Sequence, residues 1–255
     1  MAAGYVVVLV TAANEKEAEE ITEILLQMKK AACVNMVSGV KSRFWWNGKI
    51  DCADDECTNN IACRKEVTKK LDLFVMSQCP YGTQALNAMQ EVLANFNKTM
   101  NFEVHFIAND NGDGTFTSLH GQAEVDEDIR ESCVMKYYPD NYQFMNYIWC
   151  RNKNIQSTDW QSCATENKMD ASKIKACFEG QEGKTLLTEK IKLANDLQIG
   201  ASPTWMANNK VIFSGVDAET IKTNFCKANT GTSGCEKTLT GASQTAGSAA
   251  GGACG

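Results

Sequence analysis

Hydrophobic and polar positions follow a strand-like and then a helix-like period near the N-terminus. Residues 5–10 are a short apolar run typical of a buried strand, and apolar positions with helical spacing follow as far as Met28. Asn14 and Glu17 are placed as a capping box at the start of that helix. Residues 32–50 then carry β-branched and aromatic residues in an extended pattern. The pattern predicts a strand, a helix and a long strand.

A second region of regular patterning begins at residue 71. "LDLFVM" predicts a buried strand, a helical pattern starts at Pro80, and "FEVHFIA" predicts another strand. This order is that of a βαβ unit with parallel strands. Residues 121–200 are mostly helical, and "PTWMANNKVIFSG" predicts a hairpin with Asn208 and Asn209 in its turn. A last helix is expected at about 217–226.

Composition separates these regions. Polar, turn-rich residues precede the second region, whereas the chain after residue 228 consists mostly of small residues and ends in the uncharged "GASQTAGSAAGGACG", with too little apolar mass to order itself. We therefore expect a β-α-β segment over 1–56, a linker over 57–70, an α/β domain over 71–227 and a flexible tail over 228–255. Within the linker, a Cys57–Cys63 disulfide is favoured over zinc, which needs a fourth ligand.

The charge balance limits the partners. The 255 residues carry a formal net charge of -6, which gives no electrostatic attraction to nucleic acid or to an anionic membrane. No apolar run approaches the roughly eighteen residues that span a bilayer. "YVVVLV" lacks a basic flank and is interpreted as a strand, so we expect no signal peptide.

Twelve cysteines are many for a reducing compartment, and ten of them lie beyond residue 55. This density suggests structural disulfides and an extracytoplasmic or secretory location. The N-terminus, where we expect no signal peptide, does not agree with that location. Cys226 and Cys235 form a plausible local pair, Cys33 is expected to be a buried free thiol, and Cys254 is expected to be unpaired. Four further cysteines allow two disulfides in three connectivities: Cys133, Cys150, Cys163 and Cys177.

The candidate nucleophile is Cys79, which ends an apolar run immediately before Pro80. Unpaired backbone N–H groups and the dipole of a helix N-terminus stabilise a thiolate, so this position would lower the pKa of the thiol. Proline suits the first helical turn because its missing N–H would have had no partner there. The alternative for an isolated cysteine is a buried structural role at the end of a strand.

A second feature supports the catalytic interpretation. Small residues precede Pro203, and a hairpin and a helix follow it. The order of strand, Cys-Pro-x-x helix, strand, helical insertion, Pro-Thr hairpin and helix resembles the thioredoxin superfamily over residues 71–227. The resemblance implies a thioredoxin-like α/β fold with a helical insertion at about 121–200. It also implies a cis peptide at Pro203, with Ser202, Pro203 and Thr204 shaping a substrate groove.

Within that superfamily, the helical insertion looks like that of DsbA-type oxidoreductases. The cysteine pattern looks more like gamma-interferon-inducible lysosomal thiol reductases and the lumenal region of plant vacuolar sorting receptors. The residues that carry this likeness are His120-Gly121, Glu124, Cys133, "YIWC" ending at Cys150, Cys163, Cys177, Cys226 and Cys235. The reductases place a cysteine and a glutamine before the His-Gly pair, where this chain has Ser118 and Leu119.

The active-site motif departs from these families. They use Cys-x-x-Cys, in which the second thiol resolves the mixed disulfide formed by the first. This chain has Cys79-Pro80-Tyr81-Gly82. Three hypotheses follow: a monothiol enzyme completed by an external thiol, a redox-silent peptide-binding module, or an enzyme whose resolving cysteine is remote in sequence, with those of the helical insertion as candidates. Tyr81 and Gly82 would set access to the sulfur.

Two weaker signals lie between residues 109 and 120. "NDNGDGTFTSLH" matches the first positions of a calcium loop, but its twelfth residue is His120 where a glutamate is needed. A glycine-rich turn between two strands explains this stretch better. His120 could carry protons near the active site, although a structural hydrogen-bonding role is more common.

The N-terminal region has a different resemblance, to CutA-type divalent-cation tolerance proteins, which are trimers with a ferredoxin-like fold. The residues that carry it are Val10-Thr11, Ala32-Cys33-Val34-Asn35, Val40-Lys41-Ser42, Trp46 and Gly48-Lys49-Ile50. The resemblance ends near Glu56 and covers roughly half of that fold. It leaves open a homo-oligomer formed through this segment. The chain thus reads as a fusion of two parts.

These observations favour a thiol-disulfide oxidoreductase that acts on protein or small-molecule disulfides through Cys79. No metal site and no cofactor are assigned, apart from an external thiol such as glutathione as co-substrate. The alternatives are a redox-inactive peptide-binding module and a CutA-like metal-binding or trimerising protein.

Overall fold

The computed structural model describes residues 15–30, 34, 43–46, 49–52, 64–241 and 254. The chain divides into two compact units, residues 1–58 and residues 59–255. Three sequence predictions lie outside the described residues: the strand over 5–10, the Cys57–Cys63 disulfide and the surroundings of Cys33.

The first unit contains the helix α1 (Glu15–Gln27) and two short strands, β1 (Arg43–Trp46) and β2 (Lys49–Cys52). The strands pair antiparallel, with Trp46 opposite Lys49. The prediction of one long strand over 32–50 is therefore wrong, because β1 and β2 run in opposite directions. Asn47-Gly48, the dipeptide between the strands, is among the strongest signals for a two-residue hairpin connection.

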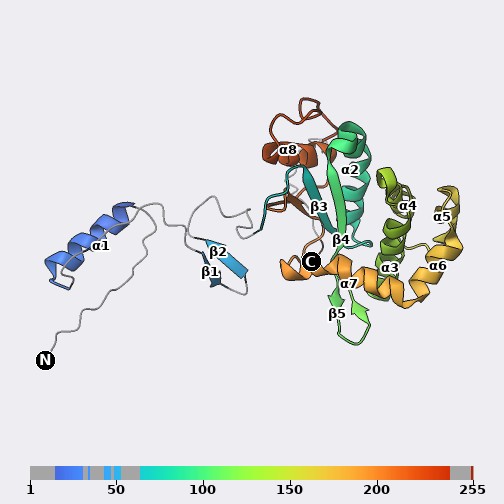
Figure 1. Cartoon of the computed structure of the whole chain (residues 1–255), viewed down its shortest axis with the longest axis horizontal. Helices are drawn as coiled ribbons and strands as arrows, with labels where there is room; N and C mark the ends of the chain where they lie inside the picture. The colour runs from blue at the N-terminus through green and yellow to red at the C-terminus, as the bar shows by residue number, and fades with distance from the viewer. Residues whose placement is uncertain are drawn as a thin grey trace. The chain divides into compact units, whose positions relative to one another are not determined.

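A four-stranded sheet with the order β4-β3-β7-β8 forms the centre of the second unit (Figure 1). Its strands are β3 (Lys70–Val75), β4 (Asn101–Phe106), β7 (Thr204–Ala207) and β8 (Val211–Phe213). β3 pairs parallel with β4 and antiparallel with β7. β3 is buried on both faces, which explains its continuous apolar sequence.

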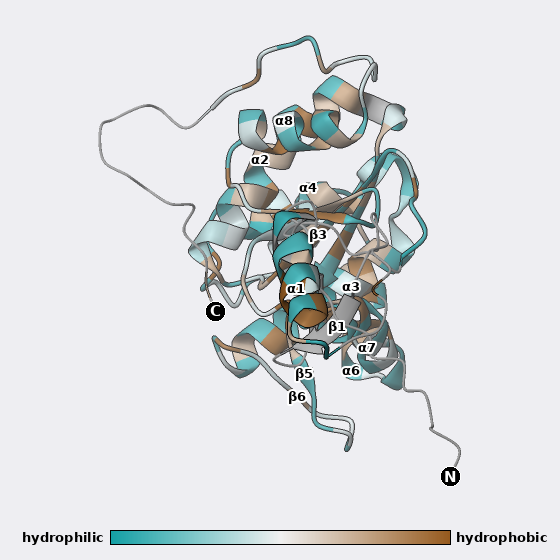
Figure 2. Ribbon diagram, turned by 90° about the vertical axis from the view of Figure 1, so that its left-hand side faces the viewer, coloured by the Kyte–Doolittle hydropathy of each residue, from teal (hydrophilic) through white to brown (hydrophobic). Residues whose placement is uncertain are grey.

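Helices cover both faces of this sheet. Leu71, Leu73 and Val75 pack with α2 (Pro80–Phe96) and α8 (Ala218–Ala228), whereas Phe74 belongs to a second apolar cluster with the end of α7 (Gln181–Asp196). Successive side chains of β3 point to opposite faces of the sheet and therefore belong to two separate hydrophobic clusters. Polar and apolar residues alternate along α8 in Figure 2, as expected for a helix with one face on the core.

The predicted hairpin is present in the second unit. β7 and β8 pair antiparallel, with Ala207 opposite Val211. Asn208 and Asn209 both have positive φ, 53° and 63°, as residues between the strands of a tight hairpin require. The segment that resembled a calcium loop is also a hairpin, in which the short strands β5 (Asn109–Asp110) and β6 (Phe116–Thr117) pair antiparallel.

The helical insertion contains α3 to α7 and is crosslinked by two disulfides. In addition to α7, its helices are α3 (Gln122–Tyr137), α4 (Phe144–Arg151), α5 (Gln161–Glu166) and α6 (Ala171–Glu179). Two single 3₁₀ turns lie at Asn97–Thr99 and Asp140–Tyr142. The structure selects the connectivity Cys133–Cys177 and Cys150–Cys163 from the three that the sequence allowed. These bonds join α3 to α6 and α4 to α5.

The chain after α8 is more ordered than the composition suggested. Cys226 is disulfide-bonded to Cys235, and the N–H of Glu219 donates to the carbonyl oxygen of Thr240. The ammonium group of Lys222 donates to the carbonyl oxygen of Lys237. The prediction of a flexible tail is therefore wrong for residues 229–241, because polar contacts, a crosslink and the packing of Cys235 and Leu239 against the core hold this segment in place.

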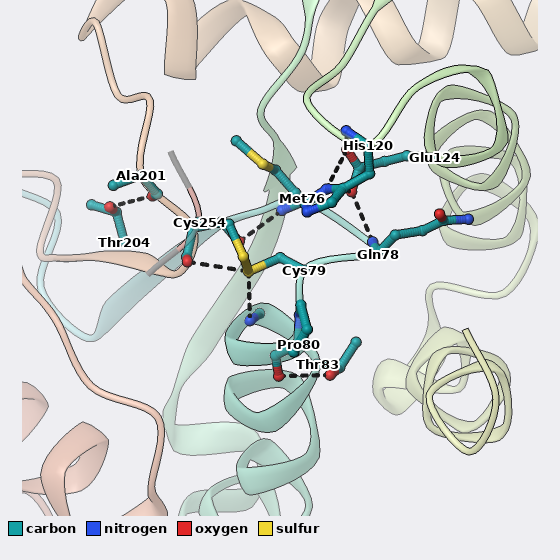
Figure 3. Close-up of a disulfide and its surroundings, with 12 residues drawn as sticks. Met76, Gln78, Cys79, Pro80, Thr83, His120, Glu124, Ala201, Thr204 and Cys254 are labelled. Atoms are coloured by element: carbon teal, nitrogen blue, oxygen red, sulfur yellow. Dashed lines mark hydrogen bonds and ion pairs between the residues drawn. A yellow bond between two sulfur atoms is a disulfide. The ribbon is translucent and has the colours of Figure 1, made fainter. Parts of the chain in front are cut away.

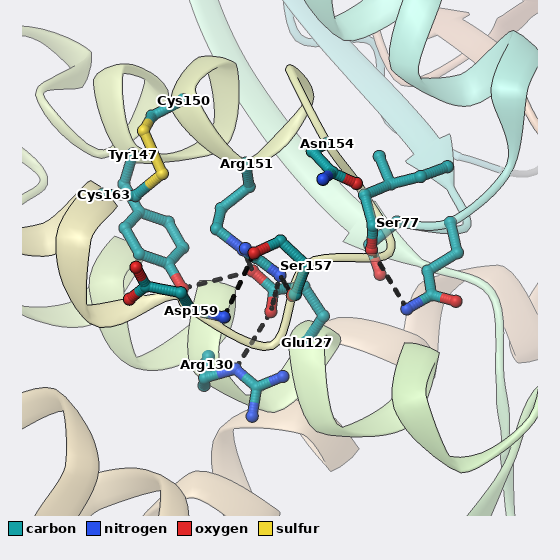
Figure 4. Close-up of polar contacts among 12 residues, drawn as sticks. Ser77, Glu127, Arg130, Tyr147, Cys150, Arg151, Asn154, Ser157, Asp159 and Cys163 are labelled. Carbon is teal, nitrogen blue, oxygen red and sulfur yellow. Dashed lines mark hydrogen bonds and ion pairs between the residues drawn. A yellow bond between two sulfur atoms is a disulfide. The ribbon is translucent and has the colours of Figure 1, made fainter.

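Helix α3 buries four acidic side chains against its neighbours. Glu127 forms ion pairs with Arg151 and Arg130 and accepts a hydrogen bond from the Tyr147 hydroxyl (Figure 4). Burial, and next the nearby charge of Glu124, raises the pKa of Asp128 well above its ordinary value. The hydroxyl of Ser77, two residues before Cys79, donates to the backbone carbonyl oxygen of Glu124 in α3. The loop that precedes Cys79 therefore rests on α3.

Replacing Asp128 by asparagine should stabilise the second unit at pH 7.5. A raised carboxyl pKa means that folding favours the neutral form of Asp128. The contribution of this group to the free energy of unfolding is therefore fully present below its unfolded pKa of about 4, and it falls as the pH rises above that value. Asp128→Asn is neutral at every pH. Its urea midpoint should exceed that of the parent at pH 7.5, and the gain should shrink as the pH approaches 4. The half-buried Asp126→Asn is the control, and an equal gain there would contradict the assignment.

Gly82 fills a space with no room for a side chain. A Cβ at this position would lie 2.6 Å from Val75 Cγ2, 2.8 Å from Ser202 Oγ and 3.0 Å from the carbonyl oxygen of Met76. These distances are too short for normal contacts, and one of the three is to backbone. The first turn of α2 can approach β3 and the Ser202 loop this closely only because residue 82 is glycine.

Gly82→Ala should lower the free energy of unfolding by about 1–3 kcal/mol, because the added methyl group overpacks the contact between α2 and β3. Denaturant unfolding of the oxidised chain measures the loss. Gly200→Ala is the matched control: its Cβ would meet nothing within 4 Å, so it should change stability by no more than about 0.5 kcal/mol. Equal losses for the two variants would rule out the steric explanation.

Candidate functional site

Cys79 lies where β3 connects to α2, at the N-terminus of that helix. Its N–H donates to the carbonyl oxygen of Met76, and its carbonyl oxygen accepts from the N–H of Thr83 in the first turn of α2. The N–H of Gly82 points to the sulfur, 3.4 Å from Sγ. The helix thus directs an unpaired donor and its positive dipole end at the sulfur, as the sequence predicted.

Cys79 is disulfide-bonded to Cys254, with the two Cα atoms 6.1 Å apart (Figure 3). The prediction that Cys254 is unpaired is wrong. The partners are separated by 175 positions in the sequence. In this state Cys79 is fully buried, and Cys254 is half-buried.

The loop before β7 lies against Cys79. The Ser202–Pro203 peptide is cis, and the carbonyl oxygen of Ser202 lies 3.4 Å from Cys79 Sγ. Ser202 Oγ accepts a hydrogen bond of 2.9 Å from the N–H of Met76, which fixes this loop to the segment that carries the cysteine. The Thr204 hydroxyl donates to the carbonyl oxygen of Ala201. The tertiary structure therefore brings the two predicted motifs together.

Backbone pairing joins the same loop to Cys254. The N–H of Ser202 donates to the carbonyl oxygen of Cys254 at 2.7 Å, and the N–H of Cys254 donates to the carbonyl oxygen of Ser202 at 2.8 Å. This reciprocal pair is an antiparallel β-bridge. Residue 254 thus occupies the position that a strand added beside the Ser202 loop would take.

His120 lies at the N-terminal end of α3 and contacts Glu124. His120 Nδ1 is 3.0 Å from Glu124 Oε1, and the same carboxylate oxygen accepts a hydrogen bond of 2.8 Å from the N–H of Gln78 (Figure 3). The Ser118 hydroxyl also donates to this carboxylate. Glu124 therefore connects His120 to the residue directly before Cys79.

A groove of about 640 Å³ lies beside this arrangement. It runs between the segment around Met76, the end of β6 with Ser118 and Leu119, and the residues from Ala194 to Gly200. The Leu119 side chain is 61% exposed and that of Tyr81 is 41% exposed, both high for apolar groups of this size. These are surfaces on which an extended peptide could bury apolar side chains.

A group of possible metal ligands lies elsewhere in the second unit. Asp72, Glu103 and His105 place ligand atoms within 4.8 Å of one another. The ammonium group of Lys70 is 3.0 Å from Asp72 and 3.4 Å from Glu103, so a cation of the chain itself already forms ion pairs with both carboxylates. This group consists of β3 and β4 residues and does not include Cys79.

The sequence did not indicate that Cys254 pairs with Cys79, or that Glu124 connects His120 to the N–H of Gln78. The tail around Cys254 carries no periodicity, and a backbone N–H such as that of Gln78 has no sequence signature. Glu124 was visible only as an acidic residue after the His-Gly pair.

Among the described residues, no helix combines the length and the apolar character needed to cross a bilayer.

Two family models match this chain. Residues 6–99 match CutA1 divalent ion tolerance protein, and residues 70–167 match gamma interferon inducible lysosomal thiol reductase (GILT). The first match extends beyond Glu56, where the resemblance was expected to end, and overlaps the second over residues 70–99. β3 and α2 lie in this overlap, and β3 hydrogen-bonds to β4 and β7, so the overlap belongs structurally to the sheet of the second unit.

Curated relatives resemble the N-terminal part. Protein CutA of Homo sapiens is 34% identical over 87 residues, which cover 34% of this chain and 48% of the relative. The CutA protein of Archaeoglobus fulgidus is 48% identical over 48 residues, covering 19% of this chain and 46% of the relative. The divalent-cation tolerance protein CutA of Pectobacterium atrosepticum is 37% identical over 81 residues, covering 32% of this chain and 73% of the relative. The chain thus spans about half the length of the first two.

Solved structures resemble the second part at low sequence identity. BdbD from Bacillus subtilis in its oxidised form aligns with a TM-score of 0.48 and 18% identity, over 62% of this chain and 86% of that protein. The oxidoreductase NmDsbA1 from N. meningitidis aligns with a TM-score of 0.45 and 14% identity, over 68% and 89%.

The two parts of the chain thus have different relatives. The sheet order, the cysteine at the start of α2 and the cis peptide before β7 are those of a thioredoxin-like fold with a helical insertion, and this unit contains the GILT match. The Pectobacterium relative is matched over more than two thirds of its length. The chain belongs to the CutA family through its N-terminal part and carries a thioredoxin-like GILT domain in its second part.

Proposed function

We propose that the second unit is a thiol-disulfide oxidoreductase that reduces disulfides through Cys79. The observation that carries the proposal is the position of the Cys79 sulfur, between the N–H of Gly82 and the cis-proline loop. The GILT match supports the direction of the reaction, because that family is described as a thiol reductase. The similarity to the oxidoreductase structures concerns only the fold of this unit.

Cys79 acts as the nucleophile in this proposal. After reduction, the sulfur would accept the Gly82 N–H bond as a thiolate, which is a charge-assisted and therefore stronger interaction. The thiolate attacks one sulfur of a substrate disulfide, forms a mixed disulfide with that sulfur and releases the other as a thiolate. No second cysteine follows at position 82, so a further thiol must complete the cycle. A small thiol such as glutathione is the external co-substrate, and two molecules of it leave as one disulfide.

Peptides with disulfides are the substrate class that the surroundings favour. The backbone N–H and carbonyl of Ser202 are positioned to pair with an extended chain, as they do with Cys254. Pairing of this kind recognises the backbone of a peptide, and the groove beside Met76 supplies apolar contacts for its side chains. Tyr81 stands at the exposed side of the motif and limits access to the sulfur.

We assign His120 a positioning role. Its ring nitrogen bonds to the Glu124 carboxylate, which in turn accepts from the N–H of Gln78. This chain of contacts holds the loop before Cys79 on α3. In this arrangement His120 acts on the sulfur through the loop.

Cys79→Ser should abolish reduction of insulin by the full chain in the presence of glutathione, because serine cannot form the mixed disulfide. The rate should fall to that of glutathione alone. Lys175→Ala, an exposed change on α6, is the control and should keep the parent rate. Equal rates for Cys79→Ser and the parent would remove the enzyme hypothesis, and retained peptide binding without turnover in the parent would favour a redox-inactive binding module.

A second candidate function belongs to the first unit. The CutA1 match at residues 6–99 supports binding of a divalent cation, or self-association, by this part of the chain. Titration of the oxidised full chain with copper(II), followed by light scattering, should show saturable binding or a mass above that of the monomer. A chain that stays monomeric and binds no copper would eliminate this candidate.

A further inference from the structure

We propose that Cys254 is the resolving cysteine of this active site and supplies the second thiol that the Cys79-Pro80-Tyr81-Gly82 motif lacks. This inference rests on the proposed function of Cys79. It replaces the external thiol in the resolving step and leaves it the role of reducing the enzyme afterwards.

The first argument is the way in which Cys254 is positioned. Beyond the disulfide itself, two reciprocal backbone hydrogen bonds, of 2.7 and 2.8 Å, join Cys254 to Ser202. Ser202 is the residue whose carbonyl oxygen lies 3.4 Å from Cys79 Sγ and whose hydroxyl is bonded to Met76. The backbone of residue 254 is thus bound at the one loop that also fixes the nucleophile.

Apolar packing adds a second, independent contact. Cys254 packs against the cluster that contains Phe74, Met76, Cys79 and Met206. These side chains come from β3, the loop after it and β7. Residue 254 is therefore held both by the pairing of its backbone with Ser202 and by the packing of its side chain against this cluster.

The remaining cysteines described in the second unit are committed elsewhere. Three disulfides join Cys133 to Cys177, Cys150 to Cys163 and Cys226 to Cys235. The helical insertion, which the sequence offered as a source of a remote resolving thiol, thus crosslinks itself. Cys254 is the described cysteine that the structure pairs with the nucleophile.

The usual position of a resolving cysteine is closed. A side chain at position 82 would overlap Val75 and Ser202, and the Ser202 hydroxyl there is engaged with the N–H of Met76. The glycine at position 82 lets the Ser202 loop pack close to α2. The backbone of Ser202 in turn pairs with Cys254, which carries the second thiol.

The chemistry balances with thiols alone. The thiolate of Cys79 attacks a substrate disulfide, forms a mixed disulfide and releases one substrate thiolate. The thiolate of Cys254 then attacks Cys79 Sγ, the Cys79–Cys254 bond forms, and the second substrate thiolate leaves, taking up a proton from solvent. The substrate has gained two electrons, and the enzyme is left in the state seen in this structure. Two molecules of a small thiol such as glutathione restore the dithiol and leave as their disulfide.

Geometry couples resolution to product release. Cys254 pairs with the backbone of Ser202, which is also where an extended peptide would pair. Pairing of Cys254 with Ser202 thus takes the place of the bound peptide as the Cys254 thiolate breaks the mixed disulfide. A tethered thiol acts at an effective concentration in the millimolar range, so it should outcompete micromolar concentrations of free thiol.

The experiment follows the mixed disulfide in the full chain. Fully reducing the chain would also open its structural disulfides, so the oxidised protein is treated briefly with limited glutathione. Mass spectrometry then verifies that the Cys133, Cys150 and Cys226 crosslinks remain. Insulin is added, and samples are quenched with acid, alkylated and mapped. The parent is compared with Cys254→Ser, Cys254→Ala and, as a control in the same part of the chain, Ser248→Ala.

In the parent and in Ser248→Ala, Cys79 should pass quickly from the insulin adduct to the Cys79–Cys254 disulfide. Both Cys254 variants should retain the Cys79–insulin adduct at least about tenfold longer, because only free thiol can resolve it. Adducts that decay equally fast in the parent and in both Cys254 variants would overturn this inference and leave the proposed function intact. Absence of any insulin adduct at Cys79 in all variants would instead overturn the proposed function and, with it, this inference.

Discussion

The close approach of the first turn of α2 to the Ser202 loop is the contact on which the site depends. Gly82 makes it sterically possible, and the hydrogen bond from the N–H of Met76 to the Ser202 hydroxyl holds it in place. Through this contact the Cys79 sulfur faces both a helix N-terminus and a cis-proline loop. A shift of this loop would move the nucleophile, the peptide-pairing edge and residue 254 together.

The helical insertion supports this contact from the other side of the active-site loop. Glu124 accepts from the N–H of Gln78, and further along α3 the Glu127 carboxylate is paired with Arg151 and Arg130. Buried charges of this kind need their partners held in place, because an unpaired charge in the interior is costly. The Cys133–Cys177 and Cys150–Cys163 disulfides hold the helices that carry these partners. The crosslinks thus serve the active site indirectly.

Local rules predicted most of the second unit. β3, α2 and β4 follow from a buried apolar run, a helical period after Pro80 and a second apolar run, and Asn208-Asn209 marks the hairpin turn. The prediction of one long strand in the first unit failed because Asn47-Gly48, a dipeptide that favours a hairpin turn, separates two strands that pair antiparallel. The prediction of a flexible tail failed for residues 229–241, where a disulfide, side-chain contacts to backbone and the packing of Cys235 and Leu239 on the core act together.

The sequence by itself determined the nucleophile candidate, its helix N-terminus, the proline loop and the absence of a second cysteine at position 82. It could not determine the partner of Cys79, because two thiols 175 residues apart meet only when the Ser202 loop binds both of them. Nor could it choose among three disulfide connectivities, since spacing along the chain does not report distance in space. The tertiary structure decided these points because they depend on which distant segments pack together, and not on local propensity.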